Sequence, residues 1–299
     1  MKGAQIQRRI TRMKIDILKS MEEGMSTFSK GQKRIAEYII NHYDKAAFLT
    51  AAKLGVEVGV SESTVVRFVI ELGFEGYPEF QKALQELIRT KLTSVQRVQV
   101  TNQLIGDGDL LSKVLYSDID KIKRTLDGID KDAFNGAVKN IVEARKIYIL
   151  GMRASSNLAG FLNYGLSIIY DKVKLVKASS GIEIFEQLMS IEPNDVVIAV
   201  SFPRYSRTLV NAVNYAKQSG AKIIALTDSE SSPIAESATN LLVAQSDMAS
   251  FMDSLVAPMS VINALIVGVS RESGELVTDR LHSLEKIWAD YKVYNSHKG

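Results

Sequence analysis

Residues 195–227 read DVVIAVSFPRYSRTLVNAVNYAKQSGAKIIALT, and this stretch decides the fold of the second half of the chain. It holds two continuous apolar runs, VVIAV at 196–200 and KIIAL at 222–226, with a helical segment between them. Continuous apolar runs of this length are typical of strands that are buried on both faces of a sheet. Because strand–helix–strand crossovers are right-handed, the stretch predicts two parallel strands of an α/β sheet.

Further apolar runs extend this pattern on both sides of the opening stretch. KIYIL at 146–150 and LLVA at 241–244 have the same character, and KVKLV at 172–176 is a weaker run. Helical segments separate them along the chain. The second half is therefore predicted to be an α/β domain with a doubly wound, mostly parallel five-stranded sheet.

Two apolar helices are expected after the last strand. Residues 254–270 are strongly apolar but contain Pro258 and Asn263 and are too short to span a bilayer, so we expect a buried helix. From Asp279 onward, Leu281, Leu284 and Trp288 form the apolar face of an amphipathic helix, and this face must be buried somewhere. These two helices are our candidates for the contact in a homodimer or homotetramer.

The loops at the carboxyl ends of the strands combine hydroxyl groups with arginines at helix starts. Ligands of open α/β sheets bind at this edge, where helix N-termini offer free N–H groups. Hydroxyl and guanidinium groups suit a phosphate monoester or a carboxylate. The alternative is that Ser155 and Ser206 merely cap helices. The expected ligand-binding residues are Arg153, Ser155, Ser156, Ser180, Ser201, Arg204, Tyr205 and Ser206.

The sequence offers no convincing catalytic residue in these loops. None of the three histidines lies at a strand end, and no carboxylate is placed to abstract a carbon-bound proton. The chain has no cysteine, no dinucleotide-binding glycine fingerprint and no phosphate-binding P-loop motif. We therefore expect a binding domain without cofactor or metal. A phosphosugar isomerase with an all-α oligomerisation domain is the alternative.

The first hundred residues are predicted to be all-α, and residues 51–70, AAKLGVEVGVSESTVVRFVI, fit a helix-turn-helix. Two short helices that cross tightly need a small residue where they touch, and Gly55 lies at that position. The turn between them needs a residue that tolerates positive φ, and Gly59 supplies it. Thr50 is expected to cap the first helix, and Val65 and Phe68 to hold the second one against it.

In a helix-turn-helix the second helix enters the DNA major groove by its N-terminal residues. Arg67 is expected to bind a guanine base or a phosphate group. Glu62 is expected to accept a hydrogen bond from the N4 amino group of cytosine, and Lys53 and Thr64 to contact the DNA backbone. The alternative is that the serines are helix caps and that Arg67 is a solvated surface residue. The expected DNA-binding residues are Lys53, Ser61, Glu62, Ser63, Thr64 and Arg67.

The charge is unevenly distributed along the 299 residues. Residues 1–97 contain 16 Lys and Arg against 11 Asp and Glu, whereas the remainder is slightly acidic and the total is +3. A basic half suggests nucleic acid, although a solvated basic surface or a protein-binding surface would give the same count. The composition, 46% hydrophobic, argues against a disordered chain. The absence of cysteine, of a signal peptide and of a membrane span fits a cytoplasmic protein.

Four parts are expected along the chain. Residues 1–95 form the helix-turn-helix domain, 96–132 a charged and partly helical linker with one helix over 109–126, 133–275 the α/β domain, and 276–299 the C-terminal amphipathic helix.

The chain resembles the RpiR family of bacterial transcriptional regulators. SESTVVRFVIELGFEGYPEF at 61–80 is similar to the second helix of the family's helix-turn-helix and the segment after it, and QKRIAEYII upstream matches as well. Residues 195–238, together with LGMRASS at 150–156, are similar to a sugar isomerase (SIS) domain. The resemblance implies a helix-turn-helix domain joined to an SIS domain that senses a phosphosugar and modulates the binding of an operator in double-stranded DNA.

The resemblance also assigns individual positions. Ser155 matches the family's serine after the first strand, and Ser201 and Ser206 match the hydroxyl positions of the later loop. Pro203 and Arg204 depart from the Ser-Gly of many SIS domains. The added arginine implies a ligand with a second acidic group, or one other than a simple hexose phosphate.

Overall fold

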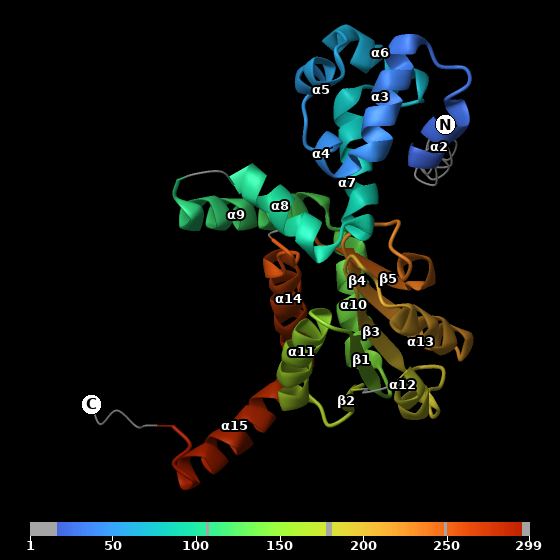
Figure 1. Cartoon of the computed structure of the whole chain (residues 1–299). Helices are drawn as coiled ribbons and strands as arrows, with labels where there is room; N and C mark the ends of the chain where they lie inside the picture. The colour runs from blue at the N-terminus through green and yellow to red at the C-terminus, as the bar shows by residue number, and fades with distance from the viewer. Residues whose placement is uncertain (1–16, 106–107, 178–180, 248–249, 295–299) are drawn as a thin grey trace. The chain divides into compact units, whose positions relative to one another are not determined.

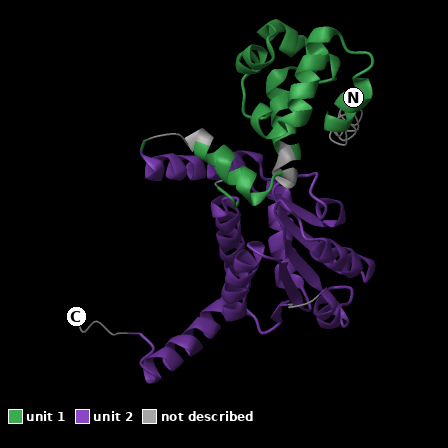
Figure 2. Ribbon diagram, viewed as in Figure 1, with its two compact units in different colours: residues 1–108, 248–252 green, residues 109–247, 253–299 purple. Residues whose placement is uncertain are grey.

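A computed structural model of the chain describes residues 17–105, 108–177, 181–247 and 250–294. The chain divides into two compact units (Figure 2). Unit 1 comprises residues 1–108 and 248–252, and unit 2 comprises residues 109–247 and 253–299. The short segment 248–252 therefore belongs to the first unit, although its neighbours along the chain belong to the second.

All regular secondary structure in the described part of unit 1 is helical, as predicted. The helices are α2 (Ile17–Gly24), α3 (Lys30–Asn41), α4 (Tyr43–Ala46), α5 (Ala51–Val58), α6 (Glu62–Glu71), α7 (Tyr77–Lys91) and α8 (Ser94–Ile105). One apolar core, which includes Ile35, Ile39, Leu54, Phe68 and Phe80, holds the first six of these helices, α2 to α7, together.

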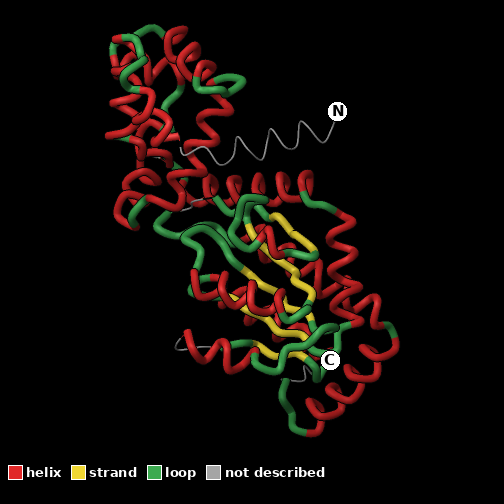
Figure 3. Tube along the Cα trace, turned by 90° about the vertical axis from the view of Figure 1, so that its right-hand side faces the viewer, coloured by secondary structure: helices red, strands yellow, loops and turns green. Residues whose placement is uncertain are grey.

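Unit 2 contains a five-stranded sheet whose neighbouring strands are all parallel (Figure 3). Its order is β2-β1-β3-β4-β5. This confirms the doubly wound sheet predicted from the apolar runs, including the weak run that becomes β2. The strands are β1 (Ile147–Gly151), β2 (Val173–Leu175), β3 (Val196–Val200), β4 (Lys222–Thr227) and β5 (Asn240–Val243).

Helices cover both faces of this sheet (Figure 1). On one face, α10 (Lys131–Glu143), α11 (Ser155–Ile169) and α14 (Val256–Ser273) form the larger apolar core with the strands. On the other face, α12 (Gly181–Leu188) and α13 (Arg207–Gln218) form a second core. Because β1 and β3 are covered on both sides, all of their residues are buried, which explains their continuously apolar sequences.

The expected linker, residues 96–132, is more helical than the sequence predicts. The expected helix over 109–126 is present as α9 (Leu110–Gly128), which Asp109 caps through the backbone N–H of Ser112. It is preceded by α8, which the sequence analysis missed. Its apolar residues are scattered among glutamines instead of forming a clear stripe.

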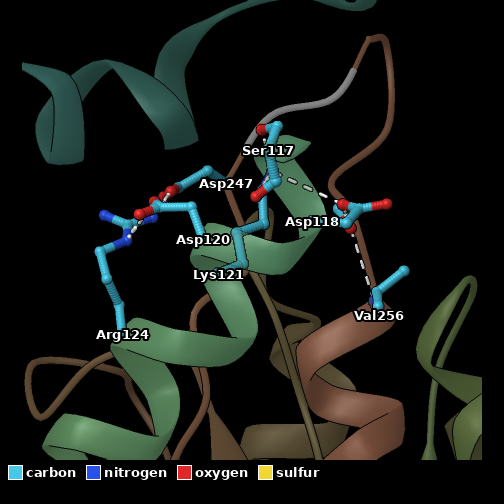
Figure 4. Close-up of polar contacts among 8 residues, drawn as sticks. Ser117, Asp118, Asp120, Lys121, Arg124, Asp247 and Val256 are labelled. Carbon is cyan, nitrogen blue, oxygen red and sulfur yellow. Dashed lines mark hydrogen bonds and ion pairs between the residues drawn. The ribbon is translucent and has the colours of Figure 1, made fainter. Parts of the chain in front are cut away.

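Helix α9 packs on the rest of unit 2 by a polar side. Lys121 is buried, whereas Leu115 and Ile119 are exposed. Figure 4 shows the polar contacts that α9 makes, among them the ion pair of Arg124 with Asp247.

The last helix is α15 (Glu275–Asp290), and its expected apolar face is partly covered within the described residues. Leu284 and Trp288 are half-buried, whereas Leu281 is exposed. Val277 is the one residue of α15 that is fully buried. The preceding helix, α14, is buried along one side as predicted, but Val267 on its other side is exposed.

None of the helices in the described residues has the length and the apolar character that a membrane span requires.

Candidate functional sites

The two helices α5 and α6 cross closely, as the positions of the glycines predict. A Cβ atom on Gly55 would lie 2.8 Å from the backbone oxygen of Val60, so this approach requires glycine. Gly59 ends α5 with φ of 67° in the left-handed region. Thr50 caps α5 by accepting a hydrogen bond from the backbone N–H of Lys53. The close contact at Gly55, the turn at Gly59 and the cap at Thr50 together fix the orientation of α6 relative to α5.

The start of α6 is organised by a small hydroxyl network. Ser61 is the N-cap, and its Oγ accepts from the backbone N–H of Thr64. The same oxygen lies 2.9 Å from Ser63 Oγ and 2.8 Å from Thr64 Oγ1. The capping alternative considered for the serines therefore holds for Ser61 itself, whereas Ser63 extends the network beyond the cap.

All but one of the expected DNA-binding residues on the α5–α6 pair are exposed to solvent. Thr64 is half-buried, and the Nε of Arg67 donates to the backbone oxygen of Ser63 at 3.2 Å, which lays the guanidinium along α6. The exposed members are Lys53, Ser61, Glu62, Ser63 and Arg67. The other face of α6 is anchored by Val65, Phe68 and Val69 in the core of unit 1.

A polar cleft of about 330 Å³ in unit 1 was not anticipated from the sequence. It lies beside α3 and α5, and its lining includes Arg34, Tyr38, His42 and Glu57. Burial raises the pKa of the Tyr38 hydroxyl, and the negative charge of Glu57 together with a hydrogen bond to that carboxylate raises this pKa further. These side chains come from two helices that are separate in the sequence, so no local motif predicts the cleft.

In unit 2 the two expected ligand loops leave the sheet side by side. Gly151 at the end of β1 is the register partner of Val200 at the end of β3. The chain proceeds from β1 to β2 on one side, whereas β3 lies on the other, so these two strands flank the topological switch point. This crevice at the carboxyl edge is where open α/β sheets bind their ligands.

Both loops contain an arginine in the left-handed conformation. Arg153 has φ of 56° and Arg204 has φ of 61°, and both side chains are exposed. Gly151 allows α11 to approach β1, since a Cβ atom there would lie 2.5 Å from the backbone oxygen of Ser155. The N-terminus of α11 thereby comes directly to the end of the strand. Its N-cap residue, Ala154, makes no capping bond through its side chain.

The serines of the two loops differ in what their hydroxyls do. Ser156 Oγ donates to the backbone oxygen of Arg153 at 2.6 Å, and Ser206 caps α13 through the backbone N–H of Leu209. Ser155 and Ser201 are buried at the strand ends and cap no helix. Ser180, also expected to bind ligand, lies outside the described residues.

A third strand end joins the site through Tyr205. Its hydroxyl donates to Asp228 Oδ1 at 2.8 Å, which ties the loop after β3 to the end of β4. Asp228 also accepts from Thr227, whose Oγ1 lies 2.8 Å from Ser232 Oγ. The sequence analysis named Tyr205 but missed this carboxylate, because residues 23 positions apart carry no local signal of their pairing. The Asp228 carboxylate is held by hydroxyl donors.

Comparisons with known proteins agree with the two-part architecture. A family model for the helix-turn-helix domain of the rpiR family matches residues 15–91, and a model for the SIS domain matches residues 140–268. The chain belongs to the RpiR family. Its α5–α6 pair lies inside the first match, and both ligand loops lie inside the second.

Relatives of this RpiR-family chain include named regulators. It is 26% identical over 286 residues to the HTH-type transcriptional regulator HexR of Escherichia coli K12, covering 91% of this chain and 94% of HexR. The sugar isomerase domain of an RpiR transcription factor from Sphaerobacter thermophilus is 28% identical, with a TM-score of 0.56, and the match covers 58% of this chain and 97% of that domain.

A third relative shares the fold over nearly the full length. The Vibrio vulnificus NanR protein, solved in complex with ManNAc-6P, has a TM-score of 0.58 at 23% identity. The match covers 92% of this chain and 99% of NanR.

Proposed function

We propose that this RpiR-family protein is a DNA-binding transcriptional regulator whose activity responds to a small phosphorylated or otherwise acidic metabolite. The observation that carries the proposal is the exposed N-terminal end of α6. Ser61, Glu62, Ser63 and Arg67 project there from a helix that Gly55 and Phe68 lock into place. A rigidly held helix end with donors and acceptors of this kind fits reading of base edges in the major groove.

The SIS unit is proposed to hold the metabolite at the switch point between β1 and β3. The buried hydroxyls of Ser155 and Ser201 and the exposed guanidinium groups of Arg153 and Arg204 favour a phosphate or carboxylate. The ManNAc-6P complex of NanR supports this chemistry by analogy. Arg204, in place of the family's more common glycine, favours a ligand with a second acidic group.

Binding without turnover is the proposed role of this unit. The Asp228 carboxylate at the end of β4 already accepts hydrogen bonds from the hydroxyl groups of Tyr205 and Thr227. Incubation with aldose and ketose phosphates, followed by analysis of the sugars, tests the isomerase alternative, because interconversion above the rate without protein would establish it.

The regulator is proposed to act in the cytoplasm as an assembly of at least two copies. Two recognition helices related by a two-fold axis read half-sites about one helical turn apart. A metabolite can alter operator binding only if it binds two arrangements of the assembly with different affinity.

Gel-shift titration of fragments from upstream of the protein's own gene tests the DNA-binding part. We expect tighter binding to one fragment than to random DNA at the same salt concentration. Arg67→Ala should weaken specific binding about 10-fold or more, since a bidentate base contact is worth roughly 1–3 kcal/mol. Lys82→Ala, which removes another exposed positive charge, on α7, is the matched control. Equal losses for the two variants would contradict the assignment.

Thermal-shift screening of sugar phosphates and sugar acids tests the ligand part. A ligand that binds the folded state alone raises the unfolding temperature by mass action. Arg204→Ala should reduce the shift, whereas Arg271→Ala on the exposed surface of α14 should preserve it. If no compound of either class shifts the transition, the proposed ligand chemistry is wrong.

A further inference from the structure

The first turn of α3 carries positive charge at the end of the helix where negative charge is usual. The first five residues of α3 include Lys30, Lys33 and Arg34, and none of the five is acidic. The free N–H groups at a helix N-terminus make this end electropositive, so three cations there destabilise α3. No Asp or Glu in the described part of the chain offsets this by forming an ion pair with these three side chains. Departures from local preference of this kind are expected at functional sites.

This turn of α3 lies beside α6, and the two helices pack against each other (Figure 1). A Cβ atom on Gly31 would lie 3.6 Å from Val60 Cγ1 and 3.7 Å from Thr64 Cγ2, which are ordinary van der Waals distances. The Nε2 of Gln32 donates to the carboxylate of Glu71 and so joins the same turn to the last residue of α6. The first turn of α3 is therefore held against α6 by contacts at both ends of that helix.

Arg34 extends this positive charge to the turn between α5 and α6. Its Nη2 occupies the space that a Cβ atom on Gly59 would need, so the guanidinium lies against this exposed glycine. Glu37 and Glu57 line the polar cleft together with Arg34, and Glu57 bonds the hydroxyl of Tyr38. Within the described residues no hydrogen bond engages the Arg34 guanidinium, and the side chain is exposed. Its N–H groups are therefore available to a ligand that approaches from solvent.

We propose that Lys30 and Arg34, which we call the α3 cations, bind phosphate groups of the operator backbone beside the groove that α6 enters. The proposal rests on the proposed DNA-binding function and extends its surface to a third helix. When one helix occupies the groove, the elements next to it lie at the level of the backbone, where phosphates are the available groups. A guanidinium binds phosphate bidentately, and an ammonium group binds it as a point charge. The α3 cations thus contribute affinity and register without reading bases.

Lys30→Glu distinguishes a DNA contact from a solvated lysine. A carboxylate in the first turn of α3 suits the helix N-terminus, so the variant should unfold at a higher temperature than the parent protein. It should bind the operator and random DNA less tightly by the same factor, about 10-fold or more at a fixed salt concentration, because it repels phosphate. A variant that gains stability and keeps the parental affinity for DNA would identify Lys30 as a solvated side chain and overturn its assignment.

Arg34→Ala and neutral phosphate analogues locate the second contact. Arg34→Ala should lower the slope of log affinity against log salt by about one, whereas Lys82→Ala on α7 should leave the slope unchanged. Methylphosphonate links, which lack the phosphate charge, are then placed one at a time in the operator. One link that weakens binding by the parent protein should have no effect on Arg34→Ala, because the partner of that phosphate is already missing. Lys82→Ala should keep the parental pattern of sensitive links.

The parent protein and a conservative variant separate the outcomes. Arg34→Lys keeps the charge and should retain the salt slope, and thermal unfolding verifies that each variant is folded. If the parent binds one fragment specifically but Lys30→Glu and Arg34→Ala both keep its affinity and salt slope, the α3 cations do not contact DNA. A loss confined to the operator, with random DNA bound as before, would assign them to bases and overturn the phosphate contact. A parent protein without preference for any fragment would instead refute the proposed function on which this inference rests.

Discussion

At the scale of single residues, Arg204 combines a strained backbone conformation with a charge that suits the proposed ligand site. Its φ of 61° lies in the left-handed region, which costs an L-residue other than glycine roughly 1 kcal/mol. The same residue brings a positive charge to the end of β3. The backbone strain is thus tolerated at the place where an anionic ligand is expected.

Arg204→Gly should separate these two effects. We expect the free energy of unfolding to stay equal or to rise by up to about 1 kcal/mol, since glycine takes positive φ without strain. The affinity for an acidic ligand should fall. Urea unfolding and ligand titration measure the two quantities. Asn194→Gly is the control, because Asn194 also has positive φ, at 74°, but precedes β3 instead of following it. A stability loss above 1 kcal/mol for Arg204→Gly would refute the strain argument.

Tyr77 predicts a specific loss of stability in alkali. Burial raises its pKa to about 12 from the ordinary value of 10, and its hydroxyl donates to the backbone oxygen of Leu49 at 2.9 Å. Between pH 10 and 12 the unfolded chain loses this proton while the folded chain keeps it, so stability falls as pH rises. Below pH 10 the hydroxyl is protonated in both states, so this loss of stability is absent. Its size at pH 12 is roughly 2 kcal/mol.

Chemical unfolding at pH 9 and at pH 11.5 measures this effect. Tyr77→Phe should be less stable than the parent at pH 9, by about 1 kcal/mol for the lost hydrogen bond, and should show a smaller decline between the two values. Parallel declines in the two proteins would show that Tyr77 does not titrate in this window.

At the scale of elements, the start of α6 combines a structural and a functional demand on Ser61. Ser61→Ala removes the cap and should destabilise unit 1 by about 1 kcal/mol. Ser61→Asp keeps a good capping residue but places a negative charge beside DNA phosphates. It should therefore retain stability and lose DNA affinity. Thermal unfolding and gel shifts distinguish these results, and an undiminished affinity in Ser61→Asp would place the DNA elsewhere.

Elements fixed by local chemistry were predictable from the sequence. Thr50, Gly55 and Gly59 each serve as predicted, because a cap, a close crossing and a left-handed turn depend on neighbours a few residues away. The buried strands β1 and β3 were predictable from their unbroken apolar runs, because both of their faces are covered by helices.

Features that depend on distant partners were not predictable. The sequence of α9 shows an apolar stripe but not that the stripe points outward. That direction follows from the contacts of Asp118 and Thr125 with residues more than a hundred positions away. The left-handed conformations of Arg153 and Arg204 lack the glycine that ordinarily signals them. The pairing of Tyr205 with Asp228 likewise joins two separate loops.

At the scale of the whole molecule, the uneven charge predicts how DNA binding depends on salt. The first 97 residues carry an excess of positive charge, whereas the rest of the chain is slightly acidic. Operator affinity should fall steeply as salt rises, because bound counterions are released from DNA on binding. Lys53→Ala should reduce the slope of log affinity against log salt by about one and weaken all sequences alike. Arg67→Ala should instead relax the preference for the operator. Identical salt slopes for the parent and Lys53→Ala would argue against a phosphate contact.

The segment 248–252 has a consequence for anyone who recombines regulators of this kind. It is counted with the first unit, and Arg97 of α8 donates to the backbone oxygen of Phe251 within that unit. A chimera joined at residue 108 would thus take α8 from one parent and its partner loop from the other. Exchange of the DNA-binding module therefore requires two grafts, residues 1–108 and residues 248–252, taken from the same donor.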